Sequence, residues 1–317
     1  MTLLHALLSR MLSLAAVLCV CFIALETLPG DACTAFLDQD AQDPELLHNC
    51  RARLGIDQPT LIRLGGWVGA LIHGDLGTSL SRGRPVTEVL APQLRNTILL
   101  AVLAALVAIP VSIVLGILAA VRRGSTFDVG ISAFFLVAMT LPEFVIATVL
   151  IFVFAISLQW LPAITVVPTG AAILEMLPNV VLPVAVLSLV MVAHTMQVVR
   201  TRVIETMQSG FIEASRLRGL SFRRVLLGHA LPSALPPALN VIALSLASLL
   251  GGVVVIERVF NYPGLGTLTL QAIHDRDMPL VQGVVVIFTL TYIGLSLIAD
   301  LISTLLDPRI AWRSDQQ

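Results

Sequence analysis

The sequence predicts an all-helical integral membrane protein with six transmembrane helices. Its 317 residues are 57% hydrophobic and 12% charged, whereas a soluble domain usually carries about 25% charged residues. The mean hydropathy of +0.93 agrees with this class. Six apolar stretches are long enough to cross a bilayer core, which takes about 20 residues. They are residues 3–28, 97–121, 129–158, 179–199, 235–256 and 281–306.

Two of these stretches need comment. In the first, Arg10 precedes an apolar run and resembles a signal peptide. We expect a retained span instead, because no small-x-small cleavage site follows and retention keeps the number of spans even. The third stretch is longer than one crossing requires and contains Pro142. Because proline removes a helical hydrogen bond, we expect this span to be kinked, tilted or broken there.

The arginines predict the orientation in the membrane. The chain has no lysine, so 19 arginines supply all of its basic residues. Arg258 and Arg276 lie in the short loops on one side, and ten arginines follow the second, fourth and sixth spans. Those ten are at positions 122, 123, 200, 202, 216, 218, 223, 224, 309 and 313. The positive-inside rule therefore places both termini in the cytoplasm.

The spans divide the chain into three parts. Residues 1–28 form the first transmembrane helix, 29–95 an external loop, and 96–317 a core of five helices that includes the basic segment 200–234. Within the loop, glycines interrupt residues 59–80 too often for a crossing. Its apolar side chains are spaced for one face of a helix, which we expect to lie on the membrane surface with Trp67 at the interface. They are Leu61, Leu64, Trp67, Val68, Leu71 and Ile72.

The four cysteines fall in two environments. Cys19 and Cys21 lie in the first span, where free cysteine behaves as a small hydrophobe. Cys33 and Cys50 lie in the external loop, which faces an oxidising compartment in a bacterial envelope. We expect these two to form a disulfide, with about 3 kcal/mol of loop-closure stabilisation. Metal binding is the alternative, but no second pair of cysteines or histidines lies nearby.

The segment from 211 to 232 predicts a short basic helix-turn-helix between the fourth and fifth spans. Ser209 and Ser221 are suitable N-caps and Gly219 is a suitable stop, and we expect Pro232 to end the second helix. An apolar stripe with a basic edge runs along the first helix. Its residues are Phe211, Ala214, Leu217 and Arg218.

Such a helix, about ten residues long, is marginal by itself in water. Burial in a partner's groove would supply the missing contacts. The alternative is an ordinary basic loop between two spans. An E-A-x-x-x-x-G spacing favours the docking helix over the loop. It is formed by Glu213, Ala214 and Gly219, and Leu231 and Pro232 complete it. This pattern resembles the coupling segment of ABC importer permeases.

Further motifs match, in order and spacing, those of the oligopeptide, dipeptide and nickel permease family. The sequence His229-Ala230-Leu231 is similar to the peptide branch of this family. The other matching residues are Leu54, Gly55, Asp57, Pro59, Gly74, Asp75, Leu76, Gly77, Ser79, Arg84, Pro85, Val86, Leu141, Pro142, Phe144, Tyr262, Pro263, Gly264, Leu265, Gly266, Arg276, Asp277, Gln282, Gly283 and residues 28–31 and 306–309.

This resemblance implies a type I ABC importer permease-like fold in the bacterial inner membrane. It implies a permease subunit that translocates di- or oligopeptides delivered by an external solute-binding protein. The implied partners are a second homologous permease, two cytoplasmic ATPase subunits or domains that bind ATP and Mg, and membrane lipid, with no nucleic acid. The implied ATPase-coupling residues are Phe211, Glu213, Ala214, Leu217, Gly219, Leu231 and Pro232. Nickel chelates or opine-like conjugates stay open as alternative cargo.

Polar residues within the spans are candidates for the transport pathway. Charge is costly in hydrocarbon, so Glu26, Glu143, His194 and Asp300 should face the bundle interior or a pore. Pairing across the bundle is the alternative role. Small residues along one side of the second span predict close helix packing. They are Ala104, Ala108, Ser112, Gly116 and Ala119.

Several functions are disfavoured. A Walker A motif needs a lysine, so ATP hydrolysis should reside in another subunit and this chain should bind no cofactor. No H-E-x-x-H or G-x-S-x-G motif supports a membrane enzyme. A secondary transporter would show paired broken helices, and Pro142 is a single interruption. We predict no metal site at His274, Asp275 and Asp277, because Asp277 fits the family's R-D pattern and a solvated turn explains the other two.

Overall fold

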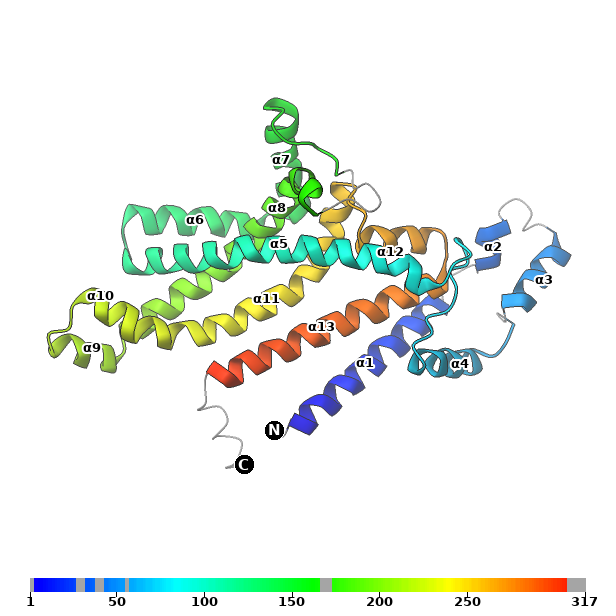
Figure 1. The fold of residues 1–317 in the computed structure, drawn as a ribbon, viewed down its shortest axis with the longest axis horizontal. Coiled ribbons are helices and arrows are strands. Elements are labelled where there is room, and N and C mark those ends of the chain that lie inside the picture. The colour runs from blue at the N-terminus through cyan, green and yellow to red at the C-terminus, as the bar shows by residue number, and fades with distance from the viewer. Residues whose placement is uncertain (1–2, 27–31, 38–42, 55–56, 166–172, 307–317) are drawn as a thin grey trace. The chain divides into compact units, whose positions relative to one another are not determined.

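A computed structural model describes residues 3–26, 32–37, 43–54, 57–165 and 173–306. In the part of the chain that it describes, every regular element is a helix (Figure 1). The elements are α1 (Leu3–Glu26), α2 (Ala32–Leu37), α3 (Pro44–Leu54), α4 (Thr60–Ile72), α5 (Val86–Val121), α6 (Thr126–Thr140), α7 (Glu143–Leu150), the π-helical η2 (Ile151–Ser157), α8 (Ile173–Met207), α9 (Gly210–Leu217), α10 (Phe222–Val225), the π-helical η3 (Leu226–Ala230), α11 (Leu231–Val259), α12 (Leu265–His274) and α13 (Met278–Leu306).

Each of the six apolar stretches contains a described helix, which confirms the all-helical membrane class. Among the described residues, four helices are long and apolar enough to cross a membrane, and a bent helix pair raises the number to five. The four candidate spans are Val86–Val121, Met176–Met207, Phe222–Leu246 and Met278–Ile298. The first predicted span, residues 3–28, coincides with α1, whose described apolar run, Leu12–Ala24, is shorter.

The expected interruption of the third span is confirmed at Pro142. Helix α6 ends at Thr140, and Leu141 and Pro142 are extended, with ψ of 134° and 142°. The chain then turns by 110° into α7 and η2. Proline restricts the preceding residue to extended conformations, and it can precede a helix because its missing N–H is not needed there. The sequence at this point therefore ends one helix and begins another.

The contacts divide the chain into two compact units. The first unit comprises Met1–Thr97 and Pro263–Ile293. Its apolar core joins the first turns of α5 to α12 and to the start of α13. The buried members of that core are Val86, Val89, Leu90, Leu265, Leu268, Ala272, Leu280, Val281 and Val284. Helix α12 lies within residues 257–280, which the sequence pattern placed in a loop.

The second unit comprises Ile98–Tyr262 and Gly294–Gln317. Helix α8 is central to it and contacts α6, α7, α9 and α11. Large buried side chains from α8, from the end of α11 and from the residues that follow it fill its core, namely Leu187, Met191, Met196, Ile256, Phe260 and Tyr262. Because α8 is covered on several sides by other helices, its sequence is apolar around most of its circumference.

The small residues of α5 pack closely, as predicted. Ala104, Ala108, Ser112 and Ala119 are all buried. At Gly116, an added Cβ would come within 2.8 Å of the Val199 side chain and 2.9 Å of the Met196 carbonyl oxygen. The Ser188 hydroxyl donates to the Ala104 carbonyl at 3.2 Å. Small side chains thus let the backbones of α5 and α8 approach each other.

Candidate functional site

The coupling segment, residues 200–234, folds back on itself through a small core of its own. Ile212 of α9, Val225 of α10 and Ala230 of η3 are fully buried together. Met207, Leu220 and Leu226 pack around them. Residues from α8, α9 and α10 thereby hold one compact structure between two long helices. The buried residues Ile212 and Val225 were not among the predicted coupling residues, because neither belongs to the apolar stripe that the sequence predicted.

The outward side of the same segment is apolar and basic. Phe211, Phe222 and Leu227 are 50%, 49% and 64% exposed, and Leu217 is 84% exposed. Arg216, Arg218, Arg223 and Arg224 are also exposed. We call these eight residues the arm surface. Glu213 is exposed in the first turn of α9, where a negative charge is favourable. Ala214 is half-buried between the two sides.

Gly219 has the left-handed conformation expected of a residue that follows a helix. Its φ is +80°, and an added Cβ would meet no atom within 4 Å. The requirement for glycine is therefore one of backbone conformation, not of space. Ser209 and Ser221 occupy the N-cap positions of α9 and α10, but neither side chain caps its helix. The Ser209 hydroxyl instead donates to the Thr206 carbonyl at 2.5 Å.

The expectation that Pro232 ends the second helix is wrong. Pro232 lies in the first turn of α11, and the chain continues helically through η3 into that helix. Its missing N–H falls where the chain passes from the π-helical η3 into α11, so the proline does not interrupt a regular α-helix. Leu231, next to it, packs on the core formed by Val199, Val203, Ala234 and Ala238. The coupling segment is thus continuous with α11.

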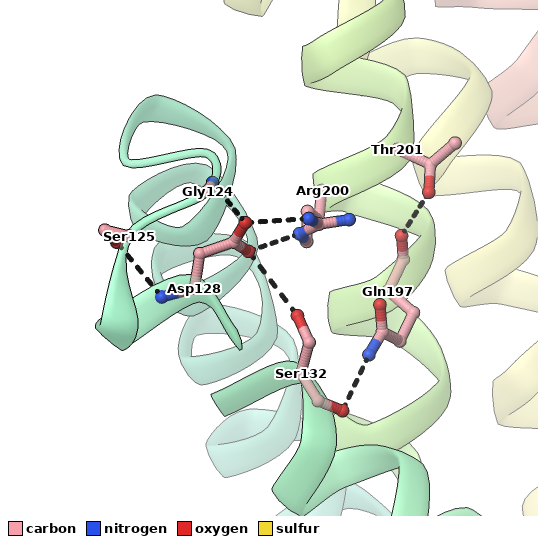
Figure 2. A network of polar contacts seen from close by, with 7 residues as sticks. All are labelled: Gly124, Ser125, Asp128, Ser132, Gln197, Arg200 and Thr201. Carbon is pink, nitrogen blue, oxygen red and sulfur yellow. Dashed lines mark hydrogen bonds and ion pairs between the residues drawn. The ribbon is translucent and has the colours of Figure 1, made fainter. Parts of the chain in front are cut away.

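A polar network holds the start of α6 to α8 immediately before the coupling segment turns outward (Figure 2). Arg200 donates from Nε to Oδ1 of Asp128 at 2.6 Å and from Nη2 to Oδ2 at 2.8 Å. Gly124 N–H also donates to Oδ2 at 2.9 Å. Asp128 N–H in turn donates to the Ser125 hydroxyl at 3.2 Å, which caps α6. The carboxylate is almost completely buried, so its charge depends on these partners.

The same network extends along α8. Gln197 donates from Nε2 to the Ser132 carbonyl at 3.3 Å, and the Thr201 hydroxyl donates to the Gln197 carbonyl at 2.9 Å (Figure 2). Sequence reasoning counted Arg200 as a topogenic charge and missed Asp128. The spacing Ser125-x-x-Asp128 was the available signal, because it is a capping pattern at a helix start. It does not, however, reveal the distant arginine.

Glu143 and His194 line one cavity within the second unit. The cavity has a volume of about 520 Å³ and lies among the end of α6, the start of α7, α8 and α11. Glu143 at the start of α7 and His194 on α8 both belong to its lining. The structure therefore brings together two of the four polar residues predicted for the pathway. The side chains of the other two, Glu26 and Asp300, lie outside the described part of the structure.

In the first unit, Asp277 is fully buried and holds a distant loop. Its Oδ2 accepts hydrogen bonds from the hydroxyls of Ser79 at 2.5 Å and Ser81 at 2.7 Å, and from the Ser81 N–H at 3.0 Å. Burial raises the pKa of Asp277, but the hydrogen bonds from these groups outweigh it and leave the pKa below its ordinary value. His274 and Asp275 are exposed. Asp277 therefore holds the loop that contains Ser79 and Ser81 in place through hydrogen bonds.

The external loop of the first unit contains α2 and α3, which its polar sequence did not indicate. Cys33 and Cys50 are joined by a disulfide between α2 and α3, with their Cα atoms 5.9 Å apart. The expected helix around Trp67 is present as α4. The Trp67 ring lies 5.8 Å from that of Phe22 in α1. On α4, Leu61 and Ile72 are 81% and 77% exposed, which leaves an apolar surface suited to a lipid interface.

The second unit thus combines a helix pair broken at Pro142, a cavity lined by Glu143 and His194, and an outward apolar and basic arm, which are features suited to a membrane transport protein. Residues 112–312 match the family model of the binding-protein-dependent transport system inner membrane component. The chain belongs to this family and is a permease component of an ABC transporter of the inner membrane.

Two relatives illustrate the likeness. The chain is 36% identical to a Brucella abortus (strain 2308) protein that is provisionally assigned as a peptide transport system permease, over 92% of each chain. It is 30% identical to the oligopeptide transport system permease protein AppB of Bacillus subtilis (strain 168), over 92% of this chain and 93% of AppB. The similarity thus extends well beyond the coupling segment to nearly the whole sequence.

Proposed function

We propose that this permease translocates di- or oligopeptides across the bacterial inner membrane in an ATP-driven importer. The observation that carries the proposal is the arm surface, where Phe211 and Leu217 are exposed although the segment has its own buried core. Exposed apolar side chains beside arginines are typical of a helix that docks in a groove of another protein. The relatives assigned to peptide transport support peptides as the cargo.

The proposed assembly contains a second homologous permease, two cytoplasmic ATPase subunits or domains, and an external solute-binding protein. ATP and Mg²⁺ bind to the ATPases, and this chain holds no cofactor of its own. Ten arginines on the proposed inner side, among them Arg216, Arg218, Arg223 and Arg224, favour cytoplasmic termini and a cytoplasmic arm. The arm surface then lies where an ATPase can reach it.

The arm is well placed to transmit movement. It joins α8, which is central to the second unit, to α11 without a flexible linker. A displacement of α9 by a docked ATPase would act on Ile212 and Val225, and through them on both long helices. Packed helices move as rigid bodies more readily than they deform. Closure of the ATPase pair would therefore switch the pore between inward-facing and outward-facing states.

Reconstitution in proteoliposomes tests this function. The chain would be purified by itself and in complex with its partner permease and ATPases, and uptake of radiolabelled dialanine would be measured with the loaded binding protein outside. We expect uptake only from the complete assembly, and only with internal ATP. Gradient-driven uptake by the chain without its partners would contradict the proposal and indicate a secondary transporter.

A further inference from the structure

The cavity around Glu143 has the dimensions of a small-molecule site. Its volume of about 520 Å³ falls within the range of roughly 300–1,000 Å³ that is usual for ligand pockets. All of its walls belong to the second unit. The lining residues are Met139, Glu143, Val190, Met191, His194, Gln197, Val198, Val241, Leu244 and Ser245.

Glu143 is held in this cavity by the break in the third span and by a glycine on α11. It is the first residue of α7, directly after the extended Pro142. Its two carboxylate oxygens lie where a side chain on Gly252 would have to be, because an added Cβ would come within 2.5 and 2.6 Å of them. The position of the carboxylate thus depends on the absence of a side chain at Gly252.

The cavity favours a positive charge. Among the lining side chains that the structure describes, Glu143 is the one carboxylate. Arg200 lies one turn beyond Gln197 on α8. Its guanidinium is paired with the carboxylate of Asp128, so it does not neutralise Glu143. A carboxylate within a membrane span is costly unless it has a partner or a function. A cationic ligand would meet that need.

The rest of the lining suits a ligand whose other parts vary. Met139 and Met191 present flexible thioethers, and Val190, Val198 and Leu244 present apolar surface. Methionine-lined surfaces adapt to side chains of different shape. All unmodified peptides share an α-ammonium group and differ in their side chains. One fixed carboxylate beside an adaptable apolar wall matches this combination.

We propose that the cavity is a transit site for the imported peptide, in which Glu143 is the counter-ion of the peptide's α-ammonium group. This inference rests on the proposed function, since it supposes that peptides pass through the permease. It assigns to Glu143 a ligand contact in addition to its favourable place at the start of α7. It also assigns the variable side chain of the peptide to the wall formed by Met139 and Met191.

Uptake by the reconstituted importer tests the role of the carboxylate. Loss of a charge-assisted contact predicts that Glu143→Gln lowers dialanine uptake by about tenfold or more. Stimulation of ATP hydrolysis by the loaded binding protein should persist, because the arm surface is unchanged. Gly252→Ala should act in the same direction by displacing the carboxylate. Gly130→Ala is the matched control, since its added Cβ meets no atom within 4 Å and uptake should be kept.

Photo-crosslinking tests occupancy directly. A dipeptide with a free amino group and a benzophenone side chain would be irradiated with the assembled importer, and adducts located by mass spectrometry. We expect adducts on Met139 or Met191, and their loss both in Glu143→Gln and with the N-acetylated probe. Normal uptake and unchanged adducts in Glu143→Gln would overturn the transit site while leaving peptide import intact. Less assembled complex with normal uptake per complex would also overturn it, as would adducts from the acetylated probe. Absence of uptake by the wild-type importer would instead overturn the proposed function.

Discussion

Arg200 on α8 donates hydrogen bonds to both carboxylate oxygens of Asp128 at the start of α6 (Figure 2). Arg200 is also the first residue of the coupling segment, so the position of α6 is tied to the point from which the arm extends. Its guanidinium makes two parallel bonds, which fix direction as well as distance. We expect this pair to keep α6 and α8 moving together when the arm is displaced.

Removal of the arginine should be strongly destabilising. Arg200→Ala leaves a carboxylate that is 3% exposed without its counter-charge, which costs about 3 kcal/mol or more. The double variant Asp128→Ala/Arg200→Ala should be less destabilised than Arg200→Ala, because no charge is stranded. Thermal denaturation of the purified complex would measure both. The control is Arg202→Ala, whose ion pair with Glu205 is exposed and worth about 1 kcal/mol or less. Equal losses at Arg200 and Arg202 would contradict this account.

Leu217→Asp should prevent assembly with the ATPase subunits. Leu217 is 84% exposed in the chain, and a central apolar residue of a docked helix can contribute about 2 kcal/mol or more to binding. The aspartate would in addition bury a charge without a partner. Co-purification of the ATPases with the permease is the measurement. Glu213→Gln serves as the control, because loss of a charge at the rim of an interface usually costs far less. Normal co-purification of Leu217→Asp would show that α9 is merely part of a loop.

Gly219→Val should leave assembly intact but weaken the transmission of movement. With φ at +80°, a β-branched residue at this position is strained by about 1 kcal/mol or more. We expect the complex to form and its ATPase activity to respond poorly to the loaded binding protein. Gly74→Val tests for a general effect of such strain, since Gly74 has φ of +77° in the first unit and an added Cβ there would meet no atom within 4 Å. Full stimulation of Gly219→Val would remove Gly219 from the coupling residues.

Cys33 and Cys50 should be bonded in protein isolated from membranes. They belong to different helices of the loop and are 17 residues apart, which predicts about 3 kcal/mol of stabilisation by loop closure. Mass spectrometry after alkylation without reduction would detect the linked peptides. Cys19 and Cys21 are free cysteines and provide the internal standard for alkylation. Alkylation of both Cys33 and Cys50 in freshly prepared membranes would rule the bond out.

The loop held by Asp277 should loosen as the medium becomes acidic. The folded-state pKa of Asp277 is lowered, so its contribution is fully present above the unfolded pKa of about 3.9. That contribution is lost as pH falls through the lower folded pKa, because the carboxyl group is then protonated in both the folded and the unfolded state. Thermal midpoints measured from pH 7 to pH 3 should fall more steeply for wild type than for Asp277→Asn. Asp275→Asn, an exposed neighbour, should follow the wild type.

Much of the fold was predictable because it depends on local sequence. Apolar runs of sufficient length located the membrane helices, and Pro142 located the break, since a proline restricts its own backbone and that of its neighbour. Gly219 was predicted to be left-handed from its place after a helical pattern, and its φ agrees. The helical spacing of Phe211 and Leu217 likewise predicted one face of α9, and both side chains are exposed. These features need no knowledge of which segments meet.

Tertiary structure decided what depends on distant contacts. No local pattern pairs Arg200 with Asp128, or Asp277 with Ser79 across 198 residues, because such pairs form only once the helices have packed. Pro232 was misassigned because a proline can either end a helix or lie in the first turn of one. The packing of Leu231 places it in the first turn of α11. The cavity has the same origin: Pro142 directs Glu143 inward, and Gly252, more than a hundred residues later, leaves the space that the carboxylate occupies. The sequence by itself determined the helices, their breaks and the outward face of the arm, whereas packing alone decided which charges are neutralised and which face a cavity.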